Sequence, residues 1–165
     1  MNQHTNTPPA DHAGVYHLVA PIAVVVEDDA DIRALIETIL VRAGMQVHTA
    51  STAAEGIALT SRIIPDVVTI DIGLPDADGL DVAAFLRDLT PTRDIPILMI
   101  SANANAIDME RARSRGAEAY LSKPFRPREL RDRVLSLLAV AAAPLPKKFS
   151  AAQCPSECVT GAAAS

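Results

Sequence analysis

The chain has 165 residues, which is enough for one ordinary domain with tails but too few for two. Its net charge of −5 and its lack of Trp argue against a general nucleic-acid-binding surface, which needs clustered Lys and Arg or stacking aromatics. No apolar run is long enough to span a membrane and residues 1–20 lack a signal-peptide pattern, so we expect a cytoplasmic location without membrane contact.

The first third of the chain changes from irregular to periodic. Residues 1–20 are polar, and we interpret them as a flexible leader. Residues 22–27 are mostly β-branched and end in acid, which is typical of a strand buried on both faces. Apolar residues recur at helical spacing over residues 32–40, and Gly44 can end that helix. Residues 46–50 predict a second, short strand.

The middle of the chain repeats the alternation of helix and strand. Thr52 and Glu55 have the spacing of a capping box, which predicts the start of a second helix. That helix should stop before Pro65, because proline disfavours a helical residue in front of it. Residues 66–71 predict a third strand that again ends in acid, and residues 80–86 predict the helix after it.

The last third contains two more strand and helix pairs. Residues 96–101 predict a fourth strand, and residues 105–115 a more polar helix. Residues 118–122 predict a fifth strand, and Pro127 is well placed as the first residue of a last helix. Residues 141–165 show no periodicity, so we expect a disordered tail or a linker.

Five strands, each followed by a helix, predict an α/β fold with a doubly wound, five-stranded parallel sheet. Cys154 and Cys158 lie in the tail, with no His or further Cys nearby to complete a zinc site. We interpret them as free thiols, although a pair at this spacing could also form a disulfide or bind metal.

Polar side chains follow four of the predicted strands. They are Glu27, Asp28 and Asp29 after the first strand, Asp71 after the third, Ser101 after the fourth and Lys123 after the fifth. The carboxyl ends of parallel strands meet at one edge of a sheet, where ligands bind in such folds, so we expect these side chains to lie together. Adjacent carboxylates repel one another and need a cation to stay ionised, and hard oxygen ligands suit Mg²⁺.

The expected chemistry at this edge is phosphoryl transfer. A carboxylate such as that of Asp71 can attack a phosphoryl donor and form an acyl phosphate. The metal ion, the Lys123 ammonium and the Ser101 hydroxyl could each stabilise one phosphoryl oxygen. Asp76 and Asp78 lie in the loop after Asp71, and we interpret them as turn-forming residues.

With these residues in place, the chain resembles the receiver domains of bacterial two-component systems over about residues 20–140. The motifs that carry the resemblance are Val24–Asp29, Asp71–Pro75, Asp78–Gly79, Ser101–Ala102 and Tyr120–Phe125. The resemblance implies a flavodoxin-like (βα)₅ receiver fold for residues 21–140, between the leader and the tail.

The resemblance also implies a role for each site residue. Asp71 is the phosphoacceptor, and the implied Mg²⁺ ligands are Glu27, Asp28, Asp71 and the main-chain carbonyl of Gly73. The other implied roles are the catalytic lysine (Lys123), the catalytic and switch hydroxyl (Ser101), the switch aromatic (Tyr120) and a proline where family members have a cis peptide bond (Pro124).

The implied function is signalling rather than metabolic catalysis. A sensor histidine kinase or a histidine phosphotransfer protein is the expected donor, and the chain would catalyse only its own phosphorylation and slow autodephosphorylation. A downstream protein should contact the surface of the last two helices and the strand between them. That surface includes Met109, Arg111, Arg113, Glu118, Arg128, Arg131 and Arg133, which favours an acidic or mixed-charge partner.

Two departures from the family pattern affect the expected behaviour. The winged-helix transcription-factor subfamily has an acidic pair before the switch aromatic, whereas this chain has Glu118 and Ala119, so we expect a monomer or a weak homodimer. Gly73 and Asn103 occupy positions that govern phosphoryl lifetime in this family, and they leave the lifetime open.

Alternative functions remain beside this one. A stand-alone receiver is expected because nothing in residues 141–165 resembles an output domain, but the chain could also be the receiver portion of a longer regulator. An aspartyl-phosphate phosphatase would carry a second Asp where Gly73 stands. A nucleotide-binding module would need a glycine-rich first loop. A receiver that acts as a scaffold without phosphorylation would not need the full set of site residues.

Overall fold

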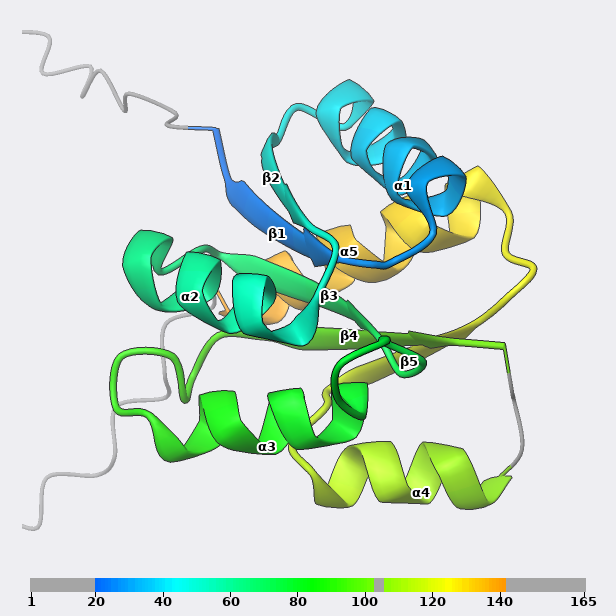
Figure 1. The fold of residues 1–165 in the computed structure, drawn as a ribbon. Helices are drawn as coiled ribbons and strands as arrows, with labels where there is room; N and C mark the ends of the chain where they lie inside the picture. Colours follow the sequence, from blue (N-terminus) through cyan, green and yellow to red (C-terminus); the bar gives the residue numbers. More distant parts are fainter. Residues whose placement is uncertain (1–19, 103–105, 142–165) are drawn as a thin grey trace, which may run out of the picture.

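The structure is a computed structural model that describes residues 20–102 and 106–141. The expectations for a flexible leader, for the tail with its two cysteines and for Asn103 therefore concern residues outside the described part. Within it, strands and helices alternate as the sequence predicts (Figure 1). In chain order they are β1 (Ile22–Val26), α1 (Ala30–Arg42), β2 (Gln46–Ala50), α2 (Ala53–Ile63), β3 (Val67–Asp71), α3 (Gly79–Asp88), β4 (Ile97–Ser101), α4 (Ala106–Ser114), β5 (Ala119–Ser122) and α5 (Pro127–Ala141).

The strands of the described part form one parallel sheet in the order β2-β1-β3-β4-β5. In the register of the central strands, Val26 pairs with Ile70 and Asp71 pairs with Ile100. The carboxyl ends of β1, β3 and β4 therefore meet at the same edge of the sheet. The predicted doubly wound α/β fold is confirmed.

Helices cover both faces of the sheet, and each face has its own apolar core. On one face, Ile36 and Leu40 of α1 pack with Leu130 and Val134 of α5. On the other face, α2, α3 and α4 contribute a second cluster, which contains Ala53, Leu86 and Ala112 among others. Figure 1 shows α1 and α5 on one side of the strands and α3 and α4 on the other. The central strands β3 and β4 are buried throughout, which explains their continuous apolar sequences.

Local sequence signals account for most helix ends. The Asp29 side chain caps α1 by accepting hydrogen bonds from the N–H groups of Asp31 and Ile32. Gly44, just beyond α1, has a φ of +90°, and Pro127 is the first residue of α5, as predicted. The apolar stripe of α1 is wider than its buried face, because Leu35 remains 44% exposed.

The capping box of α2 forms only in part. Thr52 accepts from the Glu55 N–H at 3.2 Å, but the Glu55 carboxylate accepts from the Ser51 N–H and hydroxyl instead of the Thr52 N–H. The helix ends at Ile63, before Pro65, as the sequence predicts.

Gly79 brings α3 close to the end of β3. The Gly79 N–H donates to the Ile72 carbonyl at 2.9 Å, and a Cβ on Gly79 would collide with the carbonyl oxygen of Asp71. Only glycine permits this approach, so the α3 start fixes the backbone that carries Asp71.

Candidate functional site

Three carboxylates gather at the carboxyl edge of the sheet. Glu27 and Asp28 follow β1, and Asp71 ends the neighbouring strand β3. One carboxylate oxygen from each lies within 4.8 Å of the others. Glu27 and Asp71 are buried, with 1% and 6% of their surface exposed, whereas Asp28 is exposed. The cluster is therefore anchored in the core and open to solvent at Asp28.

Lys123 brings a positive charge into this cluster from the loop after β5. Its Nζ donates to Glu27 Oε1 at 2.8 Å and lies 3.2 Å from Asp71 Oδ1. The Lys123 N–H donates to the Ser101 carbonyl at 2.7 Å, and the Lys123–Pro124 peptide bond is cis. The hydrogen bond to Ser101 joins the Lys123 main chain to the end of β4, and the ammonium bridges two carboxylates.

Burial and the hydrogen bond between Glu27 and Lys123 act in opposite directions on the pKa of each of these two residues. Burial raises the pKa of Glu27, and the nearby charges of Asp71 and Asp28 raise it further, while the hydrogen bond from Lys123 lowers it. Burial acts to lower the pKa of Lys123, but the hydrogen bond to Glu27 and the Asp71 charge outweigh it, so that the pKa is raised overall. We expect Lys123 to stay protonated, because it is the neutralising charge at this edge.

The donor set fits a hard divalent cation. Within the part of the chain that the structure describes, the buried Glu27 Oε2 has no hydrogen-bond partner. A buried carboxylate oxygen without a partner is costly unless a cation or water meets it. Three carboxylates that converge with one side open to water match the ligands of Mg²⁺ better than those of a softer metal.

The structure places the other predicted site residues around this centre. Ser101 is buried at the end of β4, next to Ile100, which pairs with Asp71. Gly73 lies beside Asp71, since a Cβ built on it would stand 3.8 Å from Asp71 Oδ2. Tyr120 pairs with Met99, farther from the strand ends, and packs against the core of the α3 face. Tyr120 is thus adjacent to the site through β4 and not part of the carboxylate cluster.

Two residues near the site were not identified from the sequence. Arg33 of α1 donates from Nη1 to the carbonyls of Glu27 and Asp28. Asp76, expected to form a turn, accepts hydrogen bonds from the N–H groups of Ala53 and Ala54 at the start of α2. Neither contact has a sequence signal, because each joins separate elements through a side chain that is common on surfaces.

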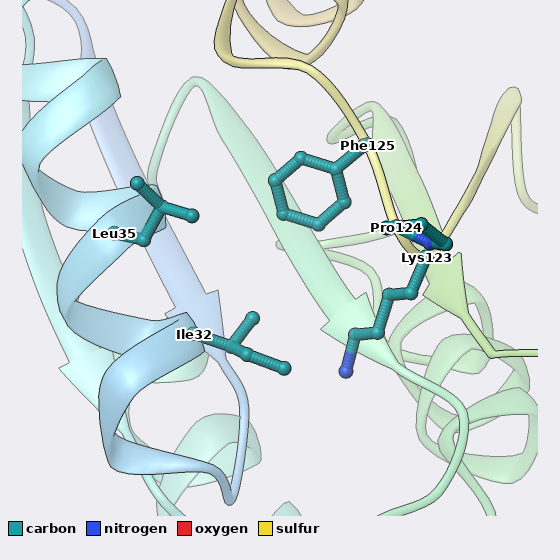
Figure 2. A pocket seen from close by; sticks show the side chains of 5 residues that line it. All are labelled: Ile32, Leu35, Lys123, Pro124 and Phe125. Atoms are coloured by element: carbon teal, nitrogen blue, oxygen red, sulfur yellow. The ribbon is translucent and has the colours of Figure 1, made fainter.

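An apolar hollow of about 360 Å³ lies beside the carboxylate cluster. It is lined by Ile32 and Leu35 of α1 and by Lys123, Pro124 and Phe125 (Figure 2). In Figure 2 the Phe125 ring stands across the hollow from Leu35, and the Lys123 amine points away from the ring. The exposed Leu35 side chain is therefore part of an apolar surface next to the carboxylate cluster.

Comparisons with known proteins identify relatives of this arrangement. Residues 23–135 match the family model described as response regulator receiver domain. The chain is 38% identical over 111 residues to the KDP operon transcriptional regulatory protein KdpE of Escherichia coli (strain K12), which covers 67% of this chain and 48% of that protein. The chain thus spans about half the length of that regulator.

Solved structures agree with this match. A crystal structure of a response regulator from Chloroflexus aurantiacus J-10-fl superposes with a TM-score of 0.71 at 31% identity, covering 73% of this chain and 99% of that one. The chemotaxis response regulator CheY4 of Vibrio cholerae gives a TM-score of 0.69 at 25% identity, covering 72% of this chain and 99% of that one. No helix in the described residues is both long and apolar enough to cross a membrane.

Proposed function

The chain belongs to the family of response regulator receiver domains, and from that premise we propose that it accepts a phosphoryl group on Asp71. The observation that carries this proposal is the position of the Asp71 carboxylate. It ends β3 close to two further carboxylates and to the Lys123 Nζ, which lies 3.2 Å from Asp71 Oδ1. A nucleophile, a neutralising cation and the ligands for a metal ion thus share one edge of the sheet.

Glu27, Asp28, Asp71 and the main-chain carbonyl of Gly73 would hold Mg²⁺. The unpartnered Glu27 Oε2 and the proximity of Gly73 to Asp71 support this ligand set. When bound, the ion supplies positive charge against the carboxylates and the phosphoryl oxygens. Lys123 contributes a second positive charge, 3.2 Å from Asp71 Oδ1.

The phosphoryl donor is a sensor histidine kinase or a histidine phosphotransfer protein. A carboxylate oxygen of Asp71 forms a bond to phosphorus while the P–N bond of the phosphohistidine breaks. The electron pair of that bond stays on the ring nitrogen, and the donor leaves as neutral histidine. Lys123 and Ser101 stabilise the phosphoryl oxygens during transfer. The chain catalyses only its own phosphorylation and slow autodephosphorylation.

Phosphorylation changes a surface that a downstream protein binds. The new charge draws the Ser101 hydroxyl, and Tyr120 turns into the space behind it. A hollow of about 240 Å³ between α4, β5 and α5 includes Met109, Arg113, Tyr120 and Arg133 in its lining, so it couples the switch aromatic to exposed arginines. Its charge favours an acidic or mixed-charge protein as partner.

The receiver spans residues 21–140, and it acts in the cytoplasm without binding nucleic acid or a membrane. One form of this function is a stand-alone receiver that works through protein contacts. The alternative is the receiver portion of a longer regulator, because the chain spans about half the length of KdpE.

Phosphorylation of the purified full chain tests the assignment of Asp71. Acetyl phosphate with Mg²⁺ should add one phosphoryl group that base and hydroxylamine remove, as measured by intact-protein mass spectrometry. Asp71→Asn should abolish the addition, because an amide is not a nucleophile toward phosphorus. Asp81→Asn, at an exposed aspartate of α3, is the matched control and should label like the unmodified chain. Stoichiometric labelling of Asp71→Asn would reject Asp71 as the acceptor.

A further inference from the structure

Arg33 joins α1 to the segment that carries two of the carboxylates. Its Nη1 donates to the Glu27 carbonyl at 2.7 Å and to the Asp28 carbonyl at 3.1 Å. One nitrogen atom thus bridges two successive carbonyls, and the Arg33 N–H also donates to the Asp29 carbonyl at 2.9 Å. The side chain is half-buried, and its hydrogen bond to the Glu27 carbonyl is partly shielded from water, whereas the one to the Asp28 carbonyl is exposed.

The segment that Arg33 contacts lies beyond the regular hydrogen bonds of the sheet. β1 ends at Val26, and the Glu27 N–H still donates to Ala50, but α1 begins only at Ala30. The carbonyls of Glu27 and Asp28 fall in this gap. The attached carboxylates repel each other and Asp71, since one oxygen from each lies within 4.8 Å of the others. Without a fixed backbone, that repulsion would spread them apart.

We propose that Arg33 is a positioning residue for the metal site, holding the Glu27–Asp28 backbone so that both carboxylates already converge before the ion binds. The inference rests on the proposed Mg²⁺-dependent function and adds to it a residue that does not touch the ion. Residues that orient metal ligands in this way typically change metal affinity by one to two orders of magnitude when removed.

The charge of Arg33 and its hydrogen bonds have opposite effects on the affinity of the site for a metal ion. A guanidinium near the site repels an incoming cation, whereas an ordered backbone favours its binding. The hydrogen bonds of Arg33 to the Glu27 and Asp28 carbonyls act directly on the backbone that carries two of the carboxylates. We therefore expect the ordering effect to outweigh the repulsion, so that removing Arg33 weakens metal binding.

Mg²⁺ titrations of the full chain by isothermal titration calorimetry test whether removing Arg33 lowers the Mg²⁺ affinity. Arg33→Ala should bind Mg²⁺ about tenfold more weakly than the unmodified chain. Arg33→Lys, which keeps the charge and a donor, should recover part of that loss. Arg42→Ala, at an exposed arginine in the last turn of the same helix, is the matched control and should bind like the unmodified chain. Unchanged or tighter binding in Arg33→Ala would overturn the proposal.

Phosphorylation kinetics separate positioning from a general loss of structure. In Arg33→Ala, the rate with acetyl phosphate should fall at low Mg²⁺ and return to the unmodified value at saturating Mg²⁺. A rate that stays low at every Mg²⁺ concentration would reject a positioning role. If Arg33→Ala does not fold, Arg33→Lys decides, with a severalfold weaker Mg²⁺ affinity expected and an unchanged affinity overturning the proposal. Failure of the unmodified chain to bind Mg²⁺ would instead reject the proposed function.

Discussion

At the scale of single residues, the carboxylates of the site differ most in their burial. Glu27 and Asp71 are enclosed and contact Lys123, whereas Asp28 faces solvent. The buried pair is neutralised in part by the lysine, but among the residues that the structure describes Asp28 forms no ion pair that would compete with a metal. Asp28 is therefore the carboxylate that can be removed with the least damage to the fold.

Asp28→Ala should weaken Mg²⁺ binding at least tenfold while leaving the melting temperature close to that of the unmodified chain. The reason is that a hard-cation ligand is lost from an exposed position. Calorimetric Mg²⁺ titration and thermal unfolding followed by circular dichroism measure the two effects. Asp31→Ala, at an exposed acid in the first turn of α1, should change neither. Equal Mg²⁺ affinity in Asp28→Ala and the unmodified chain would remove Asp28 from the ligand set.

At the scale of elements, the loop after β3 stabilises the start of a helix far from it in sequence. Asp76 Oδ1 accepts from the Ala53 N–H at 2.8 Å, and Oδ2 accepts from the Ala54 N–H at 3.0 Å. These N–H groups belong to the first turn of α2, where backbone donors lack partners within the helix and negative charge is favourable. The loop that leaves Asp71 is thereby fastened to α2.

Asp76→Ala should lower the melting temperature at neutral pH, and the difference from the unmodified chain should shrink in acid. The hydrogen bonds from Ala53 and Ala54 lower the pKa of Asp76 in the folded state. The stabilisation is therefore present above the unfolded pKa and is lost as the pH falls through the lowered folded pKa. Thermal unfolding from neutral to acid pH measures this, with Asp94→Ala, at an exposed loop residue, as control. A difference that is constant over the whole pH range would contradict the capping role.

At the scale of the whole molecule, the exposed Glu118 side chain forms its ion pair within the chain. Its carboxylate pairs with Arg87 of α3 and accepts from the Ile97 N–H at 2.7 Å. Arg87 also donates to the carbonyls of Gly116 and Ile95, so this pair fastens α3 to the segments before β4 and β5. The acid that could have formed an intermolecular salt bridge is thus used within the chain.

The phosphorylated chain should sediment as a monomer at low micromolar concentration. Glu118 is held by Arg87, Ala119 carries no charge, and the arginines exposed on α4 and α5 repel the same face of a second copy. Analytical ultracentrifugation with and without acetyl phosphate and Mg²⁺ measures the mass. A stable dimer that Arg113→Glu and Arg133→Glu dissociate would contradict this expectation and identify the α4–β5–α5 surface as a homotypic interface.

The sequence by itself determined the order of the elements and the residues at the ends of the strands. The order of the elements was predictable because buried strands and amphipathic helices each have a characteristic apolar period. The helix ends at Asp29, Gly44 and Pro127 were predictable because these residues act on their immediate neighbours. The parallel topology then placed Asp71 and Lys123 at one edge, as expected.

Only the tertiary structure decided which side chains meet across elements. The sequence predicted a turn role for Asp76 and an apolar stripe that includes Leu35. In the structure Asp76 accepts hydrogen bonds from α2, and Leu35 lines a hollow across from Phe125. It also directed Arg33 to the Glu27 carbonyl and Glu118 to Arg87. Long polar side chains have several partners within reach, and their choice depends on the distance between packed elements, which no local period of the sequence encodes.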